Sequence, residues 1–303
     1  FRGCKYSNLY YSTAQKNYIR TTILKLYKFA SIDVGSNAVR LLFTNVFETK
    51  EGPIFRKLSL VRVPIRLGED AFIHGKIGEQ KSDQLIKTMC SFKHLMNVHQ
   101  VLDYRAYATS AMREASNSPF IISEVKGYAD IDLEIIGGAQ EADTISFADL
   151  PDYMPHFEGA VFIDVGGGST ELSYIKNAKK VDSISLKIGT VRILHDAVDS
   201  ALWDQMKEWF DKHQLLKSGT PILGTGGNIN KILKVLRKQQ NDYFVNTVDL
   251  AAFKAELDAV DYDERITQFV LNPDRADVII PASQIFLTAA YWLGAEQIYI
   301  PKV

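Results

Sequence analysis

Two short stretches of this chain are nearly the same: Ile32-Asp33-Val34-Gly35-Ser36-Asn37 and Ile163-Asp164-Val165-Gly166-Gly167-Gly168-Ser169-Thr170-Glu171. Each follows an apolar run typical of a buried strand and precedes a second strand-like run, so each predicts a β-hairpin. A glycine turn lets backbone N–H groups approach phosphate oxygens, because glycine has no Cβ in the way. The Asp before each turn can hold a divalent cation, directly or through water. The repeat therefore predicts two phosphate-binding hairpins that face each other.

Composition limits the classes of protein to which the chain can belong. Its 303 residues are 46% hydrophobic and 23% charged, a globular profile with room for two domains. No apolar run approaches the roughly 18 residues of a membrane-spanning helix, so we expect no membrane contact. Cys4 and Cys90 form neither a disulfide framework nor a metal motif, which favours the cytoplasm. Without its basic first 28 residues the chain is net acidic, so we expect no nucleic-acid partner, and a phosphate ligand needs a local, metal-assisted site.

The order of predicted strands and helices repeats along the chain. Residues 29–145 and residues 146–303 each read as β-β-β-α-β-α-β-α, the order of the duplicated architecture of actin, sugar kinases and Hsp70-type ATPases. We therefore expect an α/β fold of two tandem actin-like (ribonuclease H-like) domains, with a phosphate and metal cleft between them. Residues 1–28 are predicted to be an N-terminal extension, to which we assign no function. A core-like strand at 298–300, so close to the end, predicts a truncated C-terminus.

Eight motifs, in collinear order over residues 29–303, resemble those of the exopolyphosphatase/guanosine pentaphosphate phosphatase (Ppx/GppA) family. Besides the two hairpin motifs they are Arg66-Leu67-Gly68, Ala108-Thr109-Ser110-Ala111-Met112-Arg113-Glu114-Ala115, Gly137-Gly138-Ala139-Gln140-Glu141-Ala142, Ile188-Gly189-Thr190-Val191-Arg192, Gly224-Thr225-Gly226-Gly227 and Arg275-Ala276-Asp277-Val278-Ile279. Sugar kinases lack the Ser-Asn pair after the first glycine. The resemblance implies an enzyme that removes terminal phosphate from a phosphoanhydride, and it implies a homodimer.

Hydrolysis of a phosphoanhydride needs charge neutralisation, an in-line water and a group that takes the proton of that water. Hard carboxylate oxygens at Asp33, Asp164 and Glu171 suit Mg²⁺ or Mn²⁺. Arg113 offers a planar fork to a terminal phosphate, which lysine would match less well. The residues expected to bind phosphate are Gly35, Ser36, Asn37, Gly166, Gly167, Gly168, Ser169, Gly226 and Gly227.

The resemblance places the catalytic glutamate at Glu141 and a second functional glutamate at Glu171. On the residues alone, Glu141 fits an acid that favours a helix N-terminus equally well. Asp143 stands where the family usually has Arg, which leaves the orientation of Glu141 open. Glu114 is expected to be a solvated helix residue, and the turn at 224–227 fits plain strand-to-helix packing as well as phosphate binding.

The leading interpretation is a Mg²⁺-dependent exopolyphosphatase that releases terminal phosphate from inorganic polyphosphate by attack of water. The first alternative is a guanosine pentaphosphate (pppGpp) 5′-phosphohydrolase. Both substrates present the same terminal phosphoanhydride to the same loops, so the sequence leaves the choice open. Further alternatives are a non-catalytic phosphate or nucleotide sensor, and an ATPase or kinase of the same fold.

Overall fold

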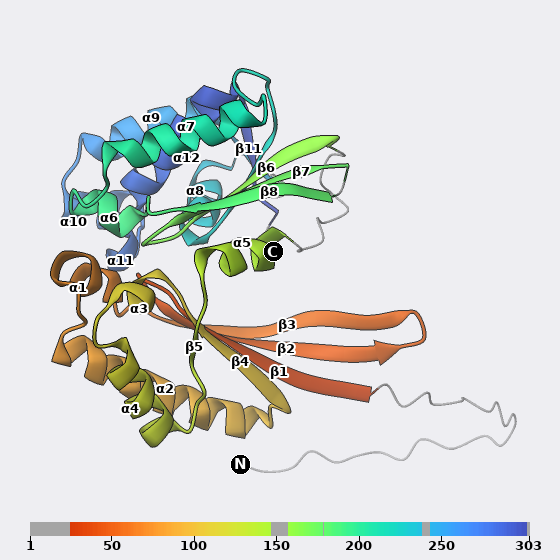
Figure 1. The fold of residues 1–303 in the computed structure, drawn as a ribbon, viewed down its shortest axis with the longest axis vertical. Coiled ribbons are helices and arrows are strands. Elements are labelled where there is room, and N and C mark those ends of the chain that lie inside the picture. Colours follow the sequence, from red (N-terminus) through yellow and green to blue (C-terminus); the bar gives the residue numbers. More distant parts are fainter. Residues whose placement is uncertain (1–24, 147–156, 178, 238–242, 302–303) are drawn as a thin grey trace, which may run out of the picture.

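The computed structural model describes residues 25–146, 157–177, 179–237 and 243–301. They form two α/β halves, which lie one above the other in Figure 1. The first half consists of β1 (Lys25–Val34), β2 (Val39–Thr49), β3 (Gly52–Val63), α1 (Leu67–His74), α2 (Glu79–His99), β4 (Asp103–Ala108), α3 (Ser110–Glu114), α4 (Ser118–Ala129) and β5 (Glu134–Ile135). Helix α5 (Gly138–Ser146) follows and packs against the second half.

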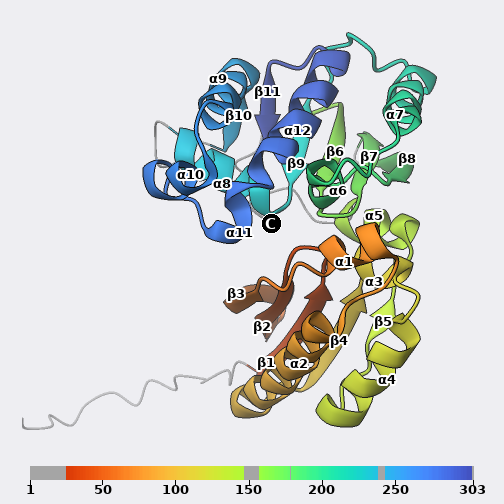
Figure 2. The same cartoon turned by 90° about the vertical axis from the view of Figure 1, so that its left-hand side faces the viewer.

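The second half begins with a β-β-β unit like that of the first. Its elements are β6 (Gly159–Val165), β7 (Thr170–Lys176), β8 (Lys179–Leu186), α6 (Thr190–Leu194), α7 (Ser200–Lys212), β9 (Ile222–Thr225), α8 (Gly227–Leu236), β10 (Phe244–Asn246), α9 (Thr247–Asp258), α10 (Tyr262–Gln268), α11 (Pro273–Ala276), α12 (Ile279–Leu293) and β11 (Gln297–Tyr299). Figure 2 shows α1, α3, α5 and α6 gathered at the junction of the halves.

The two sheets repeat one strand order. The first runs β3-β2-β1-β4-β5, and the second runs β8-β7-β6-β9-β11 with β10 added at its edge. In each half the central strand, β1 or β6, is antiparallel to the next strand and parallel to β4 or β9. Because the central strands occupy equivalent places, their carboxyl ends and the turns that follow are equivalent too. The predicted two-domain α/β fold is confirmed.

Alternating and helical apolar patterns build the two cores. On β2, Val39, Leu41 and Phe43 face the helical layer and are buried together with Leu85 and Met89 of α2. The alternate β2 residue Arg40 lies on the other face of the sheet and lines a cavity between the halves. Each sheet therefore turns one face to its own helices, and the loops at its end remain available to the junction.

One helical stretch in the described part of the chain, Pro273–Leu293, is long and apolar enough to cross a membrane by length and composition. Of its most apolar window, 61% is buried inside the protein. Helix α12, which makes up most of this stretch, packs against α6, α8 and α9. These contacts are those of a core helix.

Two predicted boundaries can be compared with the structure: the end of the N-terminal extension and the boundary between the domains. Strand β1 begins at Lys25, inside the predicted extension 1–28, because Lys25 to Lys28 continue the pairing with β2, where Lys25 lies opposite Glu48. The rest of that extension lies outside the described residues. The predicted domain boundary at 145/146 falls at the end of α5, which packs on β7 and β8 although it follows the first half. The domain limits and the truncated C-terminus stay predictions.

Candidate active site

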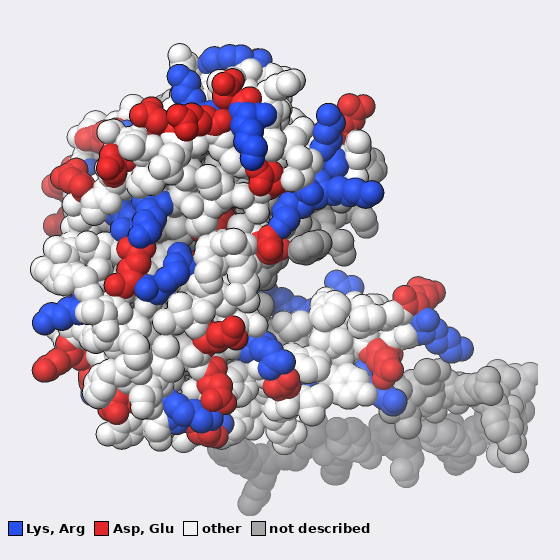
Figure 3. Space-filling view, viewed as in Figure 1, with Lys and Arg blue, Asp and Glu red and all other residues white. Residues whose placement is uncertain are grey.

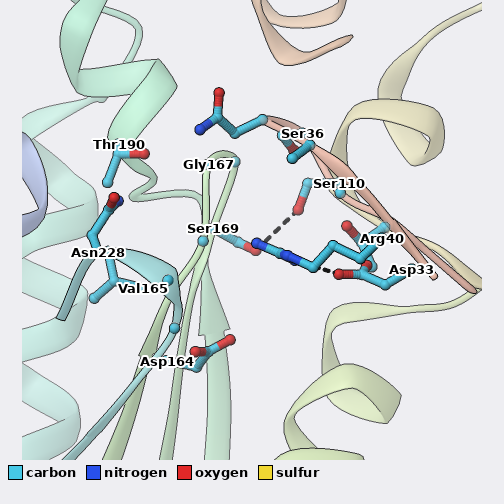
Figure 4. Close-up of a pocket in the computed structure, with 18 of the residues that line it drawn as sticks. Asp33, Ser36, Arg40, Ser110, Asp164, Val165, Gly167, Ser169, Thr190 and Asn228 are labelled. Atoms are coloured by element: carbon cyan, nitrogen blue, oxygen red, sulfur yellow. Dashed lines mark hydrogen bonds and ion pairs between the residues drawn. The ribbon is translucent and has the colours of Figure 1, made fainter. Parts of the chain in front are cut away.

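The loops that follow β1 and β6 face each other across a cavity of about 580 Å³ between the halves. Figure 3 shows the surface hollowed between the halves, and Figure 4 shows Ser36 of one loop and Gly167 of the other. A Cβ atom added to Gly167 would lie 3.0 Å from the Cβ of Ser36 and 3.3 Å from the amide nitrogen of Asn37. All nine residues predicted to bind phosphate line this cavity: Gly35, Ser36, Asn37, Gly166, Gly167, Gly168, Ser169, Gly226 and Gly227.

Helix α6 holds the second loop by its carbonyl groups. The amides of Thr190 and Val191 donate hydrogen bonds to the carbonyl oxygens of Gly166 (3.0 Å) and Gly167 (2.9 Å). Nε of Arg192 donates to the carbonyl oxygen of Gly168 (2.7 Å). Three successive carbonyls are therefore directed to α6. The amides at 167–169 have no backbone acceptor among the described residues, which leaves them available to an anion.

In the first hairpin the aspartate lies opposite a positively charged residue. Asp33 lies directly opposite Arg40 across β1 and β2, and the Arg40 guanidinium forms a salt bridge to the Asp33 carboxylate. Figure 4 shows the pair at the edge of the cavity. Both side chains are partly exposed. The predicted metal ligand Asp33 therefore has a cation as its partner in this structure.

In the second hairpin the acid faces another acid. Asp164 lies opposite Glu171 across β6 and β7. The hydroxyl of Thr225 donates to Oδ1 of Asp164 (2.8 Å), and that of Ser185 donates to Oε1 of Glu171 (2.8 Å). Burial raises the pKa of Asp164, with the charge of Asp33 adding to it. Burial and then the charges of Glu141 and Asp164 raise the pKa of Glu171 to about 8. Both carboxyls are therefore harder to ionise here than in water.

Glu141 lines the cavity from the first turn of α5. Its Oε2 atom is buried without a hydrogen-bond partner, and the nearest cation, Nη1 of Arg113, lies 3.7 Å away. Burial raises the pKa of Glu141 to about 7, and the charges of Asp164 and Asp33 add to this, while Arg113 opposes it. A carboxylate with such a pKa is suited to take a proton near neutral pH. Glu171, in contrast, does not reach the lining of the cavity and is 3% exposed.

Arg113, predicted to bind a terminal phosphate, already makes hydrogen bonds within the protein. Its guanidinium donates to the carbonyl oxygen of Ile136 (2.8 Å) and to Oγ of Ser110 (3.1 Å), and it does not line the cavity. Ser110 does line the cavity and lies 2.9 Å, Oγ to Oγ, from Ser169 of the other half (Figure 4). The role of Arg113 as a phosphate ligand stays a prediction. In this structure its guanidinium lies 3.7 Å from the carboxylate of Glu141.

Similarity to known proteins identifies the family of this chain. A family model described as the Ppx/GppA phosphatase family matches residues 45–303. This chain belongs to the Ppx/GppA phosphatase family. It is 28% identical over 204 residues to exopolyphosphatase 1 of Mycobacterium tuberculosis, covering 63% of this chain and 58% of that one. It is 24% identical over 301 residues to a bifunctional 3-dehydroquinate synthase/phosphatase of Fusobacterium nucleatum, covering 90% and 44%. The chain spans about half the length of these curated relatives.

Two solved structures show the same fold. An exopolyphosphatase from Cytophaga hutchinsonii matches with a TM-score of 0.74 and 21% identity, over 90% of this chain and 93% of that one. The Aquifex aeolicus member of the Ppx/GppA family matches with a TM-score of 0.67 and 24% identity, over 91% and 94%. At these identities the likeness shows the two-domain actin-like architecture alone.

Sequence reasoning missed the basic side of this Ppx/GppA cavity. Arg40, Lys57, Arg62 and Arg275 line it. Burial and then the charges of Arg62 and Arg40 lower the pKa of Arg275 to about 10. Positive groups that repel one another in a cavity favour a bound anion. Hairpin register could have identified Arg40, because it faces Asp33, and Arg275 belongs to a quoted motif to which no role was assigned.

The turn at 224–227 and Glu114 complete the placement of the predicted residues. Gly226 has φ +103°, a conformation that L side chains rarely adopt, and it lines the cavity at the start of α8. The turn therefore belongs to the cavity as well as to strand-to-helix packing. The expectation that Glu114 is solvated is wrong: its Oε1 lies 2.6 Å from Nη2 of Arg192 in the other half. Helical spacing could not show a partner so far away in the sequence.

Proposed function

We propose that this chain is a Mg²⁺-dependent exopolyphosphatase that releases terminal phosphate from inorganic polyphosphate by attack of water. One observation carries the proposal: Glu141, whose Oε2 has no hydrogen-bond partner, lines the same cavity as the loop with available amides at 167–169. Anion donors and a candidate base in one cavity are the two requirements of phosphoanhydride hydrolysis. Because the chain spans only part of its curated relatives, its activity, substrate and partners are all proposals.

The two sides of the cavity suit different parts of the reaction. The amides at 167–169, the hydroxyls of Ser36 and Ser169, and the guanidinium of Arg275 would bind phosphate oxygens. Glu141 would orient the attacking water and take its proton, while the charge of Arg113, 3.7 Å away, would favour the ionised form of Glu141. These groups are placed before substrate binds, so little reorganisation is needed during reaction.

The donor set fits a divalent cation. Asp164 supplies hard oxygens at the cavity, Asp33 lines the same cavity, and Glu171 lies opposite Asp164 across β6 and β7 without reaching the lining. No group of three or more His, Cys, Asp or Glu within the described ranges is arranged to hold a metal ion. Mg²⁺ commonly binds through one or two carboxylates together with water and substrate phosphates, so this set suits a cation that arrives with substrate. When bound, Mg²⁺ or Mn²⁺ would neutralise phosphate charge and polarise a P–O bond.

The lining favours a linear polyanion over a nucleotide. Among the described residues that line the cavity there is no Phe, Tyr, Trp or His, on which a guanine or adenine base could stack. Of its basic residues on β3, Arg62 lies opposite Arg40 and pairs with Asp274, while Lys57, opposite Thr44, extends the positive charge away from the loops. We therefore rank polyphosphate above pppGpp and ATP. A homodimer and a cytoplasmic location stay predictions.

The test is phosphate release from polyphosphate, pppGpp and ATP, measured side by side with Mg²⁺ and with excess EDTA. We expect the highest kcat/KM on polyphosphate and no activity in EDTA. A higher kcat/KM on pppGpp would make the chain a guanosine pentaphosphate phosphohydrolase, and preference for ATP would support the ATPase or kinase interpretation. No release from any of the three would favour the sensor, and full activity in EDTA would remove the metal from the proposal.

A further inference from the structure

Arg192 is a buried cation that touches both halves of the molecule. It is 6% exposed, although it lies on the short helix α6. Its Nε donates to the carbonyl oxygen of Gly168 (2.7 Å), and its Nη2 donates to Oε1 of Glu114 (2.6 Å). The carbon at the centre of its guanidinium lies 3.8 Å above the ring centroid of Phe72. One side chain thus joins the second phosphate loop to α1 and α3 of the first half.

These contacts compensate the burial of the guanidinium. An unpaired charge in a protein interior is strongly destabilising, whereas a charge with an ionic partner and well-formed hydrogen bonds is tolerated. Burial opposes the ionised form of Glu114, but the hydrogen bond and charge of Arg192 outweigh it, so the pKa of Glu114 is lowered. Lys187 also lies 3.4 Å from Glu114, but its side chain is 64% exposed. Arg192 is therefore the buried partner of Glu114.

The loop that Arg192 holds has no spare room. A Cβ atom on Gly168 would lie 2.5 Å from the ring of Phe72 and 2.6 Å from the Cβ of Ser110. A Cβ atom on Gly189 would lie 2.3 Å from the carbonyl oxygen of Gly167. The loop is therefore packed between α6 on one side and α1 and α3 on the other. A small shift of α6 relative to α3 must move the loop.

Helix α3 carries this contact into the rest of the site. Besides Glu114 it contributes Ser110, whose hydroxyl lies 2.9 Å from that of Ser169, and Arg113, which lies 3.7 Å from Glu141. The five-residue helix thus contacts the phosphate loop directly through Ser110, reaches it through Arg192 by way of Glu114, and places Arg113 beside the candidate base. The position of the loop and that of the base are fixed by the same element.

We infer that Arg192 is a positioning residue that sets the orientation of the amides at 167–169, and that Glu114 makes this orientation depend on contact between the two halves. The inference rests on the proposed function for its catalytic consequence, but phosphate binding tests it separately. Neither residue lines the cavity, so each acts through the loop. If the halves separate, Arg192 loses its contact with Glu114. Its hydrogen bond to the carbonyl of Gly168 is then no longer held in place, and the neighbouring amides lose the orientation that keeps them available.

Arg192→Lys tests the first part, because lysine keeps the charge but cannot bond Gly168 and Glu114 at once while stacking on Phe72. We expect affinity for inorganic phosphate, measured by calorimetry with Mg²⁺, to fall about tenfold, the scale of one charge-assisted hydrogen bond. The expected kcat/KM for polyphosphate falls at least as far. The matched control is Arg265→Lys, since Nε of Arg265 also donates to a main-chain carbonyl, that of Leu257 (2.9 Å), away from the cavity. The control is expected to change melting temperature but neither binding nor kcat/KM.

Glu114→Gln tests the second part, and it covers the case in which Arg192→Lys does not fold. Glutamine retains an oxygen that can accept from Arg192, so we expect a smaller loss of phosphate affinity, about threefold. The double variant should lose no more than Arg192→Lys alone, because both changes act on one contact. Additive losses would overturn the coupling between Glu114 and Arg192. Unchanged phosphate affinity in both single variants would overturn the inference, whatever their melting temperatures.

The outcome for the unchanged protein separates this inference from the proposed function. Phosphate binding without hydrolysis of any phosphoanhydride would overturn the function and leave the inference to be decided by the binding data. Hydrolysis with unaffected Arg192→Lys and Glu114→Gln variants would overturn the inference alone. A protein that neither binds phosphate nor hydrolyses polyphosphate would overturn both.

Discussion

The two phosphate hairpins share a backbone but differ at one position, the residue opposite the aspartate. Asp33 faces Arg40, whereas Asp164 faces Glu171. The first acid is neutralised at the rim of the cavity, and the second belongs to a buried acidic group that includes Glu141. A duplicated fold has thus placed different charges opposite its two aspartates. We attribute cation binding to the carboxylates of the second hairpin, and anion binding to the amides at 167–169 together with the basic residues beside the first hairpin.

The free energies of the pairs Asp33–Arg40 and Asp164–Glu171 also favour cation binding at the second hairpin. A partly exposed ion pair such as that of Arg40 and Asp33 contributes about 0–1 kcal/mol, so Arg40 can turn to a phosphate at small cost. The pKa values of Asp164 and Glu171 are raised by burial, so ionising them in the folded protein is unfavourable. A bound cation would remove that penalty. The second hairpin is therefore the one that gains from a metal ion.

Glu141→Gln gives the largest expected effect, because it removes the base from the acidic side. We expect kcat to fall by about 10²–10⁴ while KM and the fold persist. The matched control is Glu79→Gln, since Glu79 also lies in the first turn of a helix but is exposed. If both variants lose a little stability and keep kcat, Glu141 only favours a helix N-terminus, and the comparison of the hairpins loses its catalytic meaning.

Arg113→Lys is expected to have an intermediate effect on the acidic side. Lysine cannot bond Ile136 and Ser110 together beside Glu141, so the loss should be about 1.5–3 kcal/mol, or roughly 10–150-fold in kcat. Steady-state kinetics on polyphosphate measure it. An unchanged kcat with a raised KM would instead make Arg113 a phosphate ligand, as the sequence predicted.

Substitutions in the sheets far from the two loops are expected to have the smallest effect, and that effect is on the free energy of unfolding. Asp182, on β8 beside the second hairpin, accepts hydrogen bonds from Lys212 and His213, chiefly the former, and its pKa is lowered to about 2. Since the folded pKa lies below the unfolded one, this stabilisation is present above about pH 4 and lost as pH falls toward 2. Asp182→Asn should cost about 1 kcal/mol at pH 6 after solvent screening, and clearly less at pH 2. At the first hairpin, Glu48→Gln should cost nearly nothing, because the pair with Lys25 is exposed. Urea unfolding at several pH values checks both, and a pH-independent cost would contradict the role of Asp182.

Local patterns made much of the fold predictable. The hairpin motifs, the face of α2 with Leu85 and Met89, and the repeated order of elements depend on neighbours in the chain. The opposition of the two loops followed from the duplication, because equivalent strand ends meet in equivalent places. Glu141 was placed by its motif, and its burial and unpartnered oxygen appear only in the structure.

Pairings between distant segments were not predictable from one sequence. Glu114 and Arg192 lie on different halves, so helical spacing suggested a solvated residue where the structure has a partly buried ion pair. The basic side of the cavity combines β2, β3 and α11, and each of its arginines alone resembles an ordinary surface charge. Arg113 was assigned a free guanidinium because its contacts with Ile136 and Ser110 depend on how the turn before α5 closes.

The division of charge between the hairpins is the central claim, and Mn²⁺ titration followed by electron paramagnetic resonance tests it directly. Free Mn²⁺ would be measured against the unchanged protein, Asp164→Asn and Asp33→Asn. We predict that Asp164→Asn weakens Mn²⁺ binding by about tenfold or more, because changing even the residues that support a metal's ligands usually costs this much. Asp33→Asn should weaken it less than about threefold, because Arg40 already neutralises that carboxylate. Equal losses in the two variants, or a larger loss for Asp33→Asn, would contradict the account.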